Sequence, residues 1–147
     1  MKKLLALAML ASLSIPAAGQ SGDPYLPFQP VVAAAVSDGQ LDGSVKFFLR
    51  GQTPANGVKE IFPEAVYDKP AGTQVINISI NRACATALRR VLASFEGYAK
   101  QFGANAVIDI VSFYDQKHYE DANNFWCHQE NTGTYVVKLR GKPAIIK

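Results

Sequence analysis

The residue types best suited to chemistry gather in one segment near the C-terminus. His118, Glu120, Asp121, Cys127 and His128 lie within eleven residues, and imidazole, carboxylate and thiolate groups are all metal ligands. A metal-binding module that uses His118, Cys127 and His128 is therefore one hypothesis. Against it, neighbouring residues of a strand point to opposite faces, so Cys127 and His128 lack the spacing of a metal site.

The N-terminus predicts export. Two lysines precede an apolar run that ends at Ile15, and Pro16 and small residues follow. This order is typical of a secretory signal, and the run is too short to span a bilayer. We therefore predict a signal peptide over residues 1–19, a single domain over residues 20–147, a periplasmic or secreted location and no membrane span.

The chain has two cysteines, Cys84 and Cys127. In an exported protein such a pair first predicts a disulfide, and closing a loop of about 43 residues would add roughly 4 kcal/mol of stability. The alternative is a Cys-His enzyme, in which Cys127 would act beside His128. That chemistry needs a thiolate, which a disulfide would consume, and no G-x-S-x-G motif is present for a serine nucleophile.

Charge and glycine placement exclude two further classes of function. The whole chain has a formal net charge of +3, but loss of the two signal-peptide lysines leaves 13 basic and 12 acidic residues. Nonspecific nucleic-acid binding needs a larger basic surplus, so we predict no nucleic-acid partner. Gly103 follows a predicted helix and precedes a strand, whereas a phosphate loop places several glycines between a strand and a helix. We therefore predict no nucleotide-binding motif.

One long helix and the strand that follows it must position the candidate functional residues. Apolar residues recur at steps of three and four between Asn81, the expected N-cap, and Gly103, the expected stop. These residues are Cys84, Leu88, Val91, Phe95, Tyr98 or Ala99, and Phe102. Glu96 and Lys100 have the spacing of an ion pair on the outer face. Residues 106–114 predict a strand that is about as long as this helix, so the two elements can pack along each other.

The rest of the chain completes a small α+β fold. Residues 20–30 are expected to form an extended arm. Pro30 predicts the start of a short helix, which Gly39 ends. Residues 51–72 are expected to form a loop. Alternating or β-branched segments predict further strands at residues 44–50, 73–80 and 134–140. The last of these should pair with residues 106–114. We expect one long amphipathic helix packed on a three- to four-stranded antiparallel or mixed sheet, with one disulfide.

Two groups of side chains make a candidate interaction surface. Its members are Arg82, Arg89, Arg90, Tyr119 and Trp126. Arg82 would oppose the helix dipole, which an acidic partner would explain, although a solvated helix face is the plainer alternative. The aromatic residues flanking the polar segment suit an interface, although Phe113 and Phe125 are expected in the core. Asp109 is expected on a partly exposed strand face.

Several stretches carry a family resemblance. ACATAL opens the predicted helix, GANAVIDIVSFY follows it, FWCH precedes the last strand, and LPFQPVV and LDGSVKFFL lie near the start. In these the chain resembles short exported bacterial proteins commonly labelled excinuclease ATPase subunit. More distantly, it is similar to the small α+β domain of the YbjQ-like family and of the Rcs envelope-stress lipoprotein. That likeness implies pairing of Cys84 with Cys127, but the lipoprotein's lipid anchor and second disulfide are missing.

The sequence thus favours a noncatalytic exported envelope module. It would bind an envelope macromolecule or associate with itself through residues 115–131, and it would use no cofactor. The metal-binding module is the second hypothesis, and the Cys-His enzyme is the third.

Overall fold

The computed structural model describes residues 23–63 and 67–147. This part of the chain has an α+β architecture with two helices, α1 (Phe28–Ser37) and α2 (Ile80–Gln101). The predicted signal peptide over residues 1–19 lies outside the described residues.

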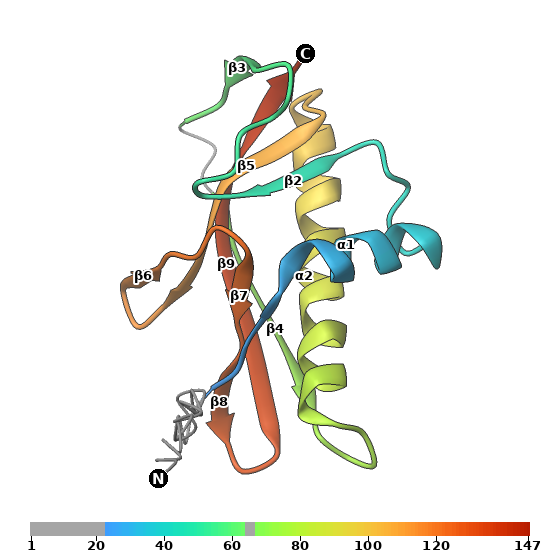
Figure 1. Cartoon of the computed structure of the whole chain (residues 1–147), viewed down its shortest axis with the longest axis vertical. Coiled ribbons are helices and arrows are strands. Elements are labelled where there is room, and N and C mark those ends of the chain that lie inside the picture. Colours follow the sequence, from blue (N-terminus) through green and yellow to red (C-terminus); the bar gives the residue numbers. More distant parts are fainter. Residues whose placement is uncertain (1–22, 64–66) are drawn as a thin grey trace, which may run out of the picture.

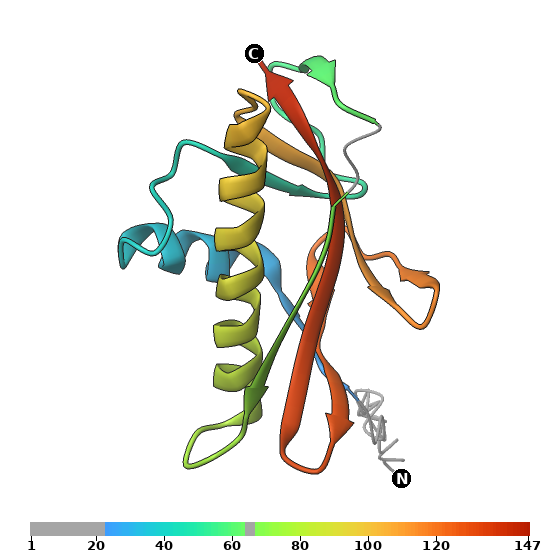
Figure 2. The ribbon, with the colours of Figure 1, turned by 180° about the vertical axis from the view of Figure 1, so that it is seen from behind.

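The described strands form a seven-stranded mixed sheet and a two-stranded sheet. They are β1 (Tyr25–Pro27), β2 (Lys46–Leu49), β3 (Val58–Ile61), β4 (Tyr67–Gln74), β5 (Ala106–Tyr114), β6 (Lys117–Tyr119), β7 (Asn124–Trp126), β8 (His128–Asn131) and β9 (Thr134–Ile146). The long strand β9 has β5 and β8 on one edge and β3 and β4 on the other. As Figures 1 and 2 show, α2 runs alongside the curled sheet. The predicted pairing of the last strand with residues 106–114 is confirmed.

The expected sheet of three or four strands is too small. Residues 51–72 were predicted to be a loop, but they contain β3 and most of β4. The sequence of β4, YDKPAGTQ, includes a proline and a glycine and has no alternation, so its strand character comes from pairing with β9 along its whole length. The strand predicted at residues 73–80 is also wrong beyond Gln74. Tertiary pairing thus overrides local propensity in β4, whereas beyond Gln74 the chain turns toward α2, with Asn77 at a φ of 55°.

Helix α2 is the long amphipathic helix that the sequence predicts, with a different start. Ser79 is its N-cap, because the Ser79 hydroxyl accepts a hydrogen bond from the backbone N–H of Arg82 at 3.1 Å. The expected N-cap, Asn81, lies inside the first turn. Gly103 follows the helix with a φ of 64°, the left-handed conformation expected of the stop. The buried residues of α2 are Ala83, Cys84, Ala87, Leu88, Val91, Leu92, Phe95, Glu96 and Ala99.

Close packing of α2 on the sheet depends on a glycine in β9. A Cβ atom added at Gly141 would lie 2.7 Å from Val107 Cγ1 and 3.1 Å from Ile110 Cγ1 on β5. It would also lie 3.4 Å from the ring of Phe95 on α2. Gly141 therefore leaves the space that these three core side chains fill.

Helix α1 crosses α2, as the two ribbon views show (Figures 1 and 2). The predicted short helix is confirmed, although it begins at Phe28, which is fully buried. Arg89 of α2 pairs with the Asp38 carboxylate at 2.7 Å and donates to the Gln40 side chain at 3.0 Å. These contacts hold the end of α1 against α2.

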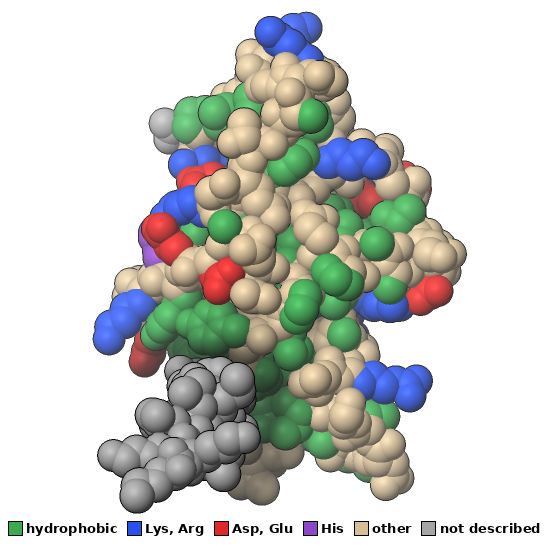
Figure 3. Space-filling model, viewed as in Figure 1, with side chains coloured by type: hydrophobic (Ala, Val, Ile, Leu, Met, Phe, Trp, Pro, Cys, Tyr) green, Lys and Arg blue, Asp and Glu red, His purple; other side chains and the backbone are tan. Residues whose placement is uncertain are grey.

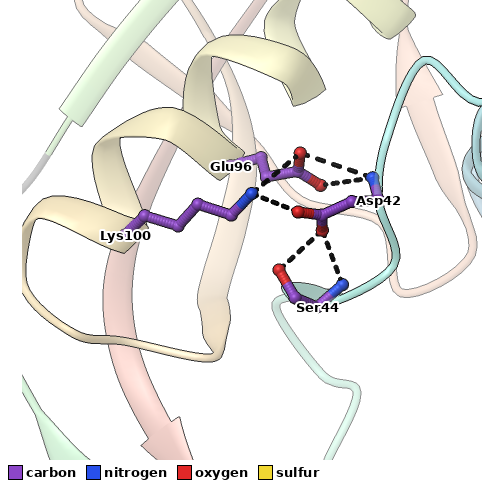
Figure 4. Close-up of polar contacts among 4 residues, drawn as sticks. All are labelled: Asp42, Ser44, Glu96 and Lys100. Carbon is purple, nitrogen blue, oxygen red and sulfur yellow. Dashed lines mark hydrogen bonds and ion pairs between the residues drawn. The ribbon is translucent and has the colours of Figure 1, made fainter.

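A polar cluster ties the loop after α1 to the last turns of α2 (Figure 4). Glu96 and Lys100 form the predicted ion pair, with 3.4 Å between Nζ and Oε1. The expected outer position is wrong for Glu96, whose carboxylate is buried and accepts a hydrogen bond from the backbone N–H of Asp42 at 3.2 Å. Lys100 also pairs with the Asp42 carboxylate. Hydrogen bonds from Lys100 and Ser44 hold the pKa of Asp42 well below its usual range.

The packing at Gly141 gives a prediction with an internal control. Gly141→Ala should destabilise the protein by about 1–3 kcal/mol, because the new methyl group overpacks Val107 and Ile110. Gly97→Ala adds the same methyl group to an exposed position of α2, where nothing lies within 4 Å. It should stabilise the protein by about 0.5–1 kcal/mol. Urea denaturation of the two variants measures both effects, and a neutral Gly141→Ala would contradict this account of the core.

Candidate functional site

Residues 115–131, the segment expected to carry the interaction, contain β6, β7 and β8. Asp115 and Gln116 form the two-residue turn between β5 and β6, with φ values of 54° and 61°. A type I′ hairpin turn needs this left-handed conformation at both central residues. Neither residue is glycine, which is why the hairpin was missed in the sequence. β6 then pairs with the end of β5, with Tyr114 opposite Lys117.

A disulfide bond between Cys84 and Cys127 fixes the segment to the start of α2. The predicted pairing is confirmed, and both cysteines are fully buried. The neighbouring backbone is held as well, because the Trp126 N–H donates to the Ser112 hydroxyl at 3.0 Å. The Cys127 N–H donates to the Pro24 carbonyl, also at 3.0 Å. Trp126 therefore sits on a backbone that is anchored covalently and by hydrogen bonds.

The described part of the predicted N-terminal arm is extended only as far as β1, because α1 already begins at Phe28. β1 pairs with β7, which places Tyr25 opposite Trp126. One oxygen of the Asp23 carboxylate lies 2.6 Å from His128 Nδ1, and the other accepts a hydrogen bond from the Gln129 N–H at 2.8 Å. Nothing in the proline-rich sequence of the arm indicated that Asp23 and Tyr25 belong to this site.

Five rings gather around β7 in what we call the aromatic patch: Tyr25, Tyr114, Tyr119, Trp126 and His128. The centre of the Trp126 ring lies 4.2 Å from that of Tyr119, 4.9 Å from that of His128 and 5.8 Å from that of Tyr114. The Tyr114 and His128 rings are 4.1 Å apart. Tyr25 is 43% exposed, and the other four are partly exposed. Figure 3 shows hydrophobic side chains gathered over β6 and β7, with acidic side chains beside them.

Acidic residues flank the aromatic patch. Burial raises the pKa of Tyr25, and the nearby Tyr119, Asp121 and Asp23 raise it further. Burial likewise raises the pKa of Tyr114, where Glu130, Asp115 and Asp23 add to the effect. Burial and the nearby carboxylates thus both disfavour ionisation of these two phenol groups.

The Asp121 carboxylate is hydrogen-bonded within its own loop. Its Oδ1 atom accepts hydrogen bonds from the backbone N–H groups of Asn123 and Asn124 at 2.8 and 2.9 Å. These two bonds hold the pKa of Asp121 below its usual range.

A charged cluster holds the loop between β6 and β7. Arg50 pairs with Glu120 of that loop and with Asp109 of β5, at 2.5 Å between Nε and Oδ1 in the second pair. Asp109 has a φ of 54° and lies where the register between β5 and β9 shifts, so it occupies a β-bulge. Its side chain is partly exposed, as expected, at 30%. Hydrogen bonds from Arg50 and Lys142 lower the pKa of Asp109.

The residues predicted as metal ligands are not brought together. Cys127 is in the disulfide, His128 contacts Asp23, and His118 lies against the Phe113 ring with its Nε2 atom 3.3 Å from Arg140. Among the described residues, no group of three or more His, Cys, Asp and Glu side chains could hold a metal ion. The nucleophile of the Cys-His hypothesis would likewise have to come from this buried disulfide.

The candidate interaction surface divides into two regions. Tyr119 and Trp126 are joined in the aromatic patch, while Arg89 pairs with Asp38 and Arg90 donates to the Gly72 carbonyl at 2.9 Å. These two arginines therefore support the packing of α2 against α1 and β4. Arg82 is exposed in the first turn of α2. The prediction that Phe113 and Phe125 belong to the core is confirmed.

The sequence matches no protein-family model, and comparisons with curated proteins and with solved structures find no match. The resemblance to the exported proteins labelled excinuclease ATPase subunit, and to the YbjQ-like and Rcs domains, therefore stays a prediction. In the described part of the chain, neither helix is long and apolar enough to cross a membrane.

Removal of the disulfide should be costly. The double variant Cys84→Ala/Cys127→Ala is expected to lose about 2–5 kcal/mol in the free energy of unfolding, because its unfolded chain is no longer cross-linked. Wild-type protein in reductant is the control and should lose a similar amount in urea denaturation. Before reduction, the denatured protein should contain no titratable thiol, and two free thiols would contradict the disulfide.

The ion pairs of Asp109 predict acid-dependent stability. Because its pKa is lowered in the folded state, the ionised carboxylate stabilises the fold above the unfolded pKa of about 3.9. This contribution is lost as the pH falls through the lower folded value. Asp109→Asn keeps a residue that tolerates positive φ, so it should be less stable than the wild type at pH 7. It should also lose less stability between about pH 5 and pH 2.

Asp115→Asn is the matched control, because Asp115 makes no ion pair among the described residues and its turn accepts asparagine. Urea denaturation at each pH gives the comparison. Parallel pH profiles for Asp109→Asn and the wild type would contradict the role assigned to the Arg50–Asp109 pair.

Proposed function

We propose that the chain is a noncatalytic exported module, periplasmic or secreted, that binds another macromolecule through the aromatic patch. The observation that carries this proposal is the contact among four rings, Tyr114, Tyr119, Trp126 and His128, at a partly exposed surface beside a disulfide. Aromatic side chains offer large contact areas with few rotatable bonds, and they are enriched at protein interfaces.

The rigid mounting of the patch supports a binding role. The segment is held at three points: by the disulfide, by the β1–β7 pairing and by the Arg50–Glu120 ion pair. A surface ordered before binding loses little side-chain and loop entropy when a partner docks. A buried disulfide is also compatible with an oxidising compartment.

The two alternatives, a metal-binding module and a Cys-His enzyme, each require a free Cys127 thiolate, which the oxidised protein lacks. A metal site with Cys127 as a ligand, or a Cys127 nucleophile, would need the disulfide to be reduced and the segment to move. We therefore place binding first. Stoichiometric zinc or copper in protein with both thiols free would favour the metal-binding module instead. Turnover that is lost in His128→Ala would favour the enzyme.

Site-specific photo-cross-linking tests the binding surface. A photoreactive phenylalanine analogue at position 25, where the ring is 43% exposed, should form adducts in intact cells on irradiation. The same analogue at position 102, where Phe102 is 37% exposed at the end of α2, is the matched control and should form few. Adducts of twice the chain mass in purified protein would identify self-association as the mode of assembly. Equal labelling at both positions, or none at position 25, would overturn the proposal.

A further inference from the structure

We propose that the occupant of the aromatic patch is a basic polypeptide segment, whose lysine or arginine side chains lie over the exposed ring faces and against the flanking carboxylates. This inference rests on the proposed function and adds the chemical class of the partner. It depends on three features: the distribution of charge along the chain, the state of the flanking carboxylates, and the way the protein covers another of its own rings.

Acidic residues are concentrated at the patch. Residues 23–27 and 114–131, which supply all five rings, contain five acidic residues and one lysine, Lys117. The five acidic residues are Asp23, Asp115, Glu120, Asp121 and Glu130. From residue 20 onward, the remainder of the chain has 12 basic and seven acidic residues. In a nearly neutral protein, the segments that supply the patch are therefore acidic, and with Arg50 counted against Glu120 they keep an excess of negative charge. Charge complementarity favours a cationic partner.

Some of these carboxylates have no partner within the described part of the chain. Glu120 is neutralised by Arg50, and Asp23 lies against His128. Asp115 and Glu130 form no ion pair among the described residues and are exposed. Asp115 follows Tyr114 directly in the chain, and Glu130 lies with His128 in β8. Both carboxylates also contribute to the raised pKa of Tyr114. They are available to pair with incoming ammonium or guanidinium groups.

Within the protein itself, cationic side chains already cover the face of one aromatic ring, that of Phe113. The Arg140 guanidinium lies 3.7 Å from the centre of the Phe113 ring, and the Lys138 ammonium lies 4.9 Å from it. Such contacts combine apolar packing of the side-chain stem with attraction between the charge and the ring face. The described residues place no lysine or arginine over the rings of Tyr25, Tyr119 or Trp126 in this manner. A partner would supply these cations.

The same features disfavour other envelope polymers. A phosphate-rich polymer would meet the carboxylates and be repelled. A neutral oligosaccharide stacks on aromatic rings but gains nothing from the net negative charge. A basic peptide uses both the rings and the acids, and an extended segment presents alternate side chains to one face at steps of about 6.6 Å.

The single tryptophan of the chain, Trp126, reports directly on occupancy. The purified exported protein is titrated with a peptide of alternating lysine and serine while tryptophan emission is followed. A peptide of alternating glutamate and serine and a neutral N-acetylglucosamine oligomer are titrated in parallel. We expect a saturable change in emission with the lysine peptide only. Its affinity should fall several-fold between about 50 and 200 mM salt, because the attraction is screened.

Two variants test the contributions of charge and ring. Asp115→Asn/Glu130→Gln should weaken lysine-peptide binding about two- to tenfold, and Tyr25→Ser should weaken it about two- to fivefold. Glu60→Gln and Phe102→Ser, which remove an exposed acid from β3 and an exposed ring from the end of α2, should bind like the wild type. Thermal melting shows whether each variant is folded, and the two exposed acids of the double variant can be replaced without disturbing the core.

The outcomes separate the two proposals. Binding that is unaffected by Asp115→Asn/Glu130→Gln, or a saturable response to the oligosaccharide or the glutamate peptide alone, overturns the inference of a basic partner. Adducts at position 25 without any response to the lysine peptide also overturn it, but leave the binding surface in place. Absence of both adducts and a peptide response would remove the proposed function itself.

Discussion

The disulfide between Cys84 and Cys127 is the constraint on which the arrangement of the candidate site depends. It joins the first turns of α2 to the residue between β7 and β8, across 43 residues of sequence. These two regions are otherwise connected through the sheet, so the cross-link fixes the aromatic patch relative to the main helix. Both cysteines are buried and belong to the hydrophobic core cluster, so the disulfide also fills core volume. A short segment with three small strands would be hard to order by backbone pairing alone.

Polar side-chain contacts also hold the segments of the aromatic patch in place. Arg50 links the end of β2 to Asp109 in the bulge of β5 and to Glu120 in the loop before β7. Asp23 links the N-terminal strand to His128 and Gln129. In each case one charged side chain joins segments that are distant in the sequence. The patch is thus assembled from β1, β5, β6, β7 and β8, and no single stretch of sequence contains it.

This mode of assembly explains which features could be predicted from the sequence. Helix α2 and strand β5 follow local periodicity, and the two cysteines leave one pairing, so all three were predicted correctly. β4 was missed because a strand that contains Pro70 and Gly72 depends on β9 for its conformation. The β5–β6 hairpin was missed because Asp115 and Gln116 adopt the left-handed conformation without a glycine. Tyr119 and Trp126 were recognised from residue type, whereas Tyr25 joins them through strand pairing.

The surroundings of the Phe113 ring differ from those of the aromatic patch, and the difference lies in the charge of the neighbouring side chains. Phe113 is 4% exposed and is covered by the cationic side chains of Lys138 and Arg140. The rings of the patch are partly exposed and are flanked by carboxylates instead. Carboxylates contribute nothing favourable to the face of a ring, whose own quadrupole is negative, so the fold gains little from this arrangement. Negative groups beside exposed rings are better explained by a positively charged partner, for which rings and acids act in the same direction.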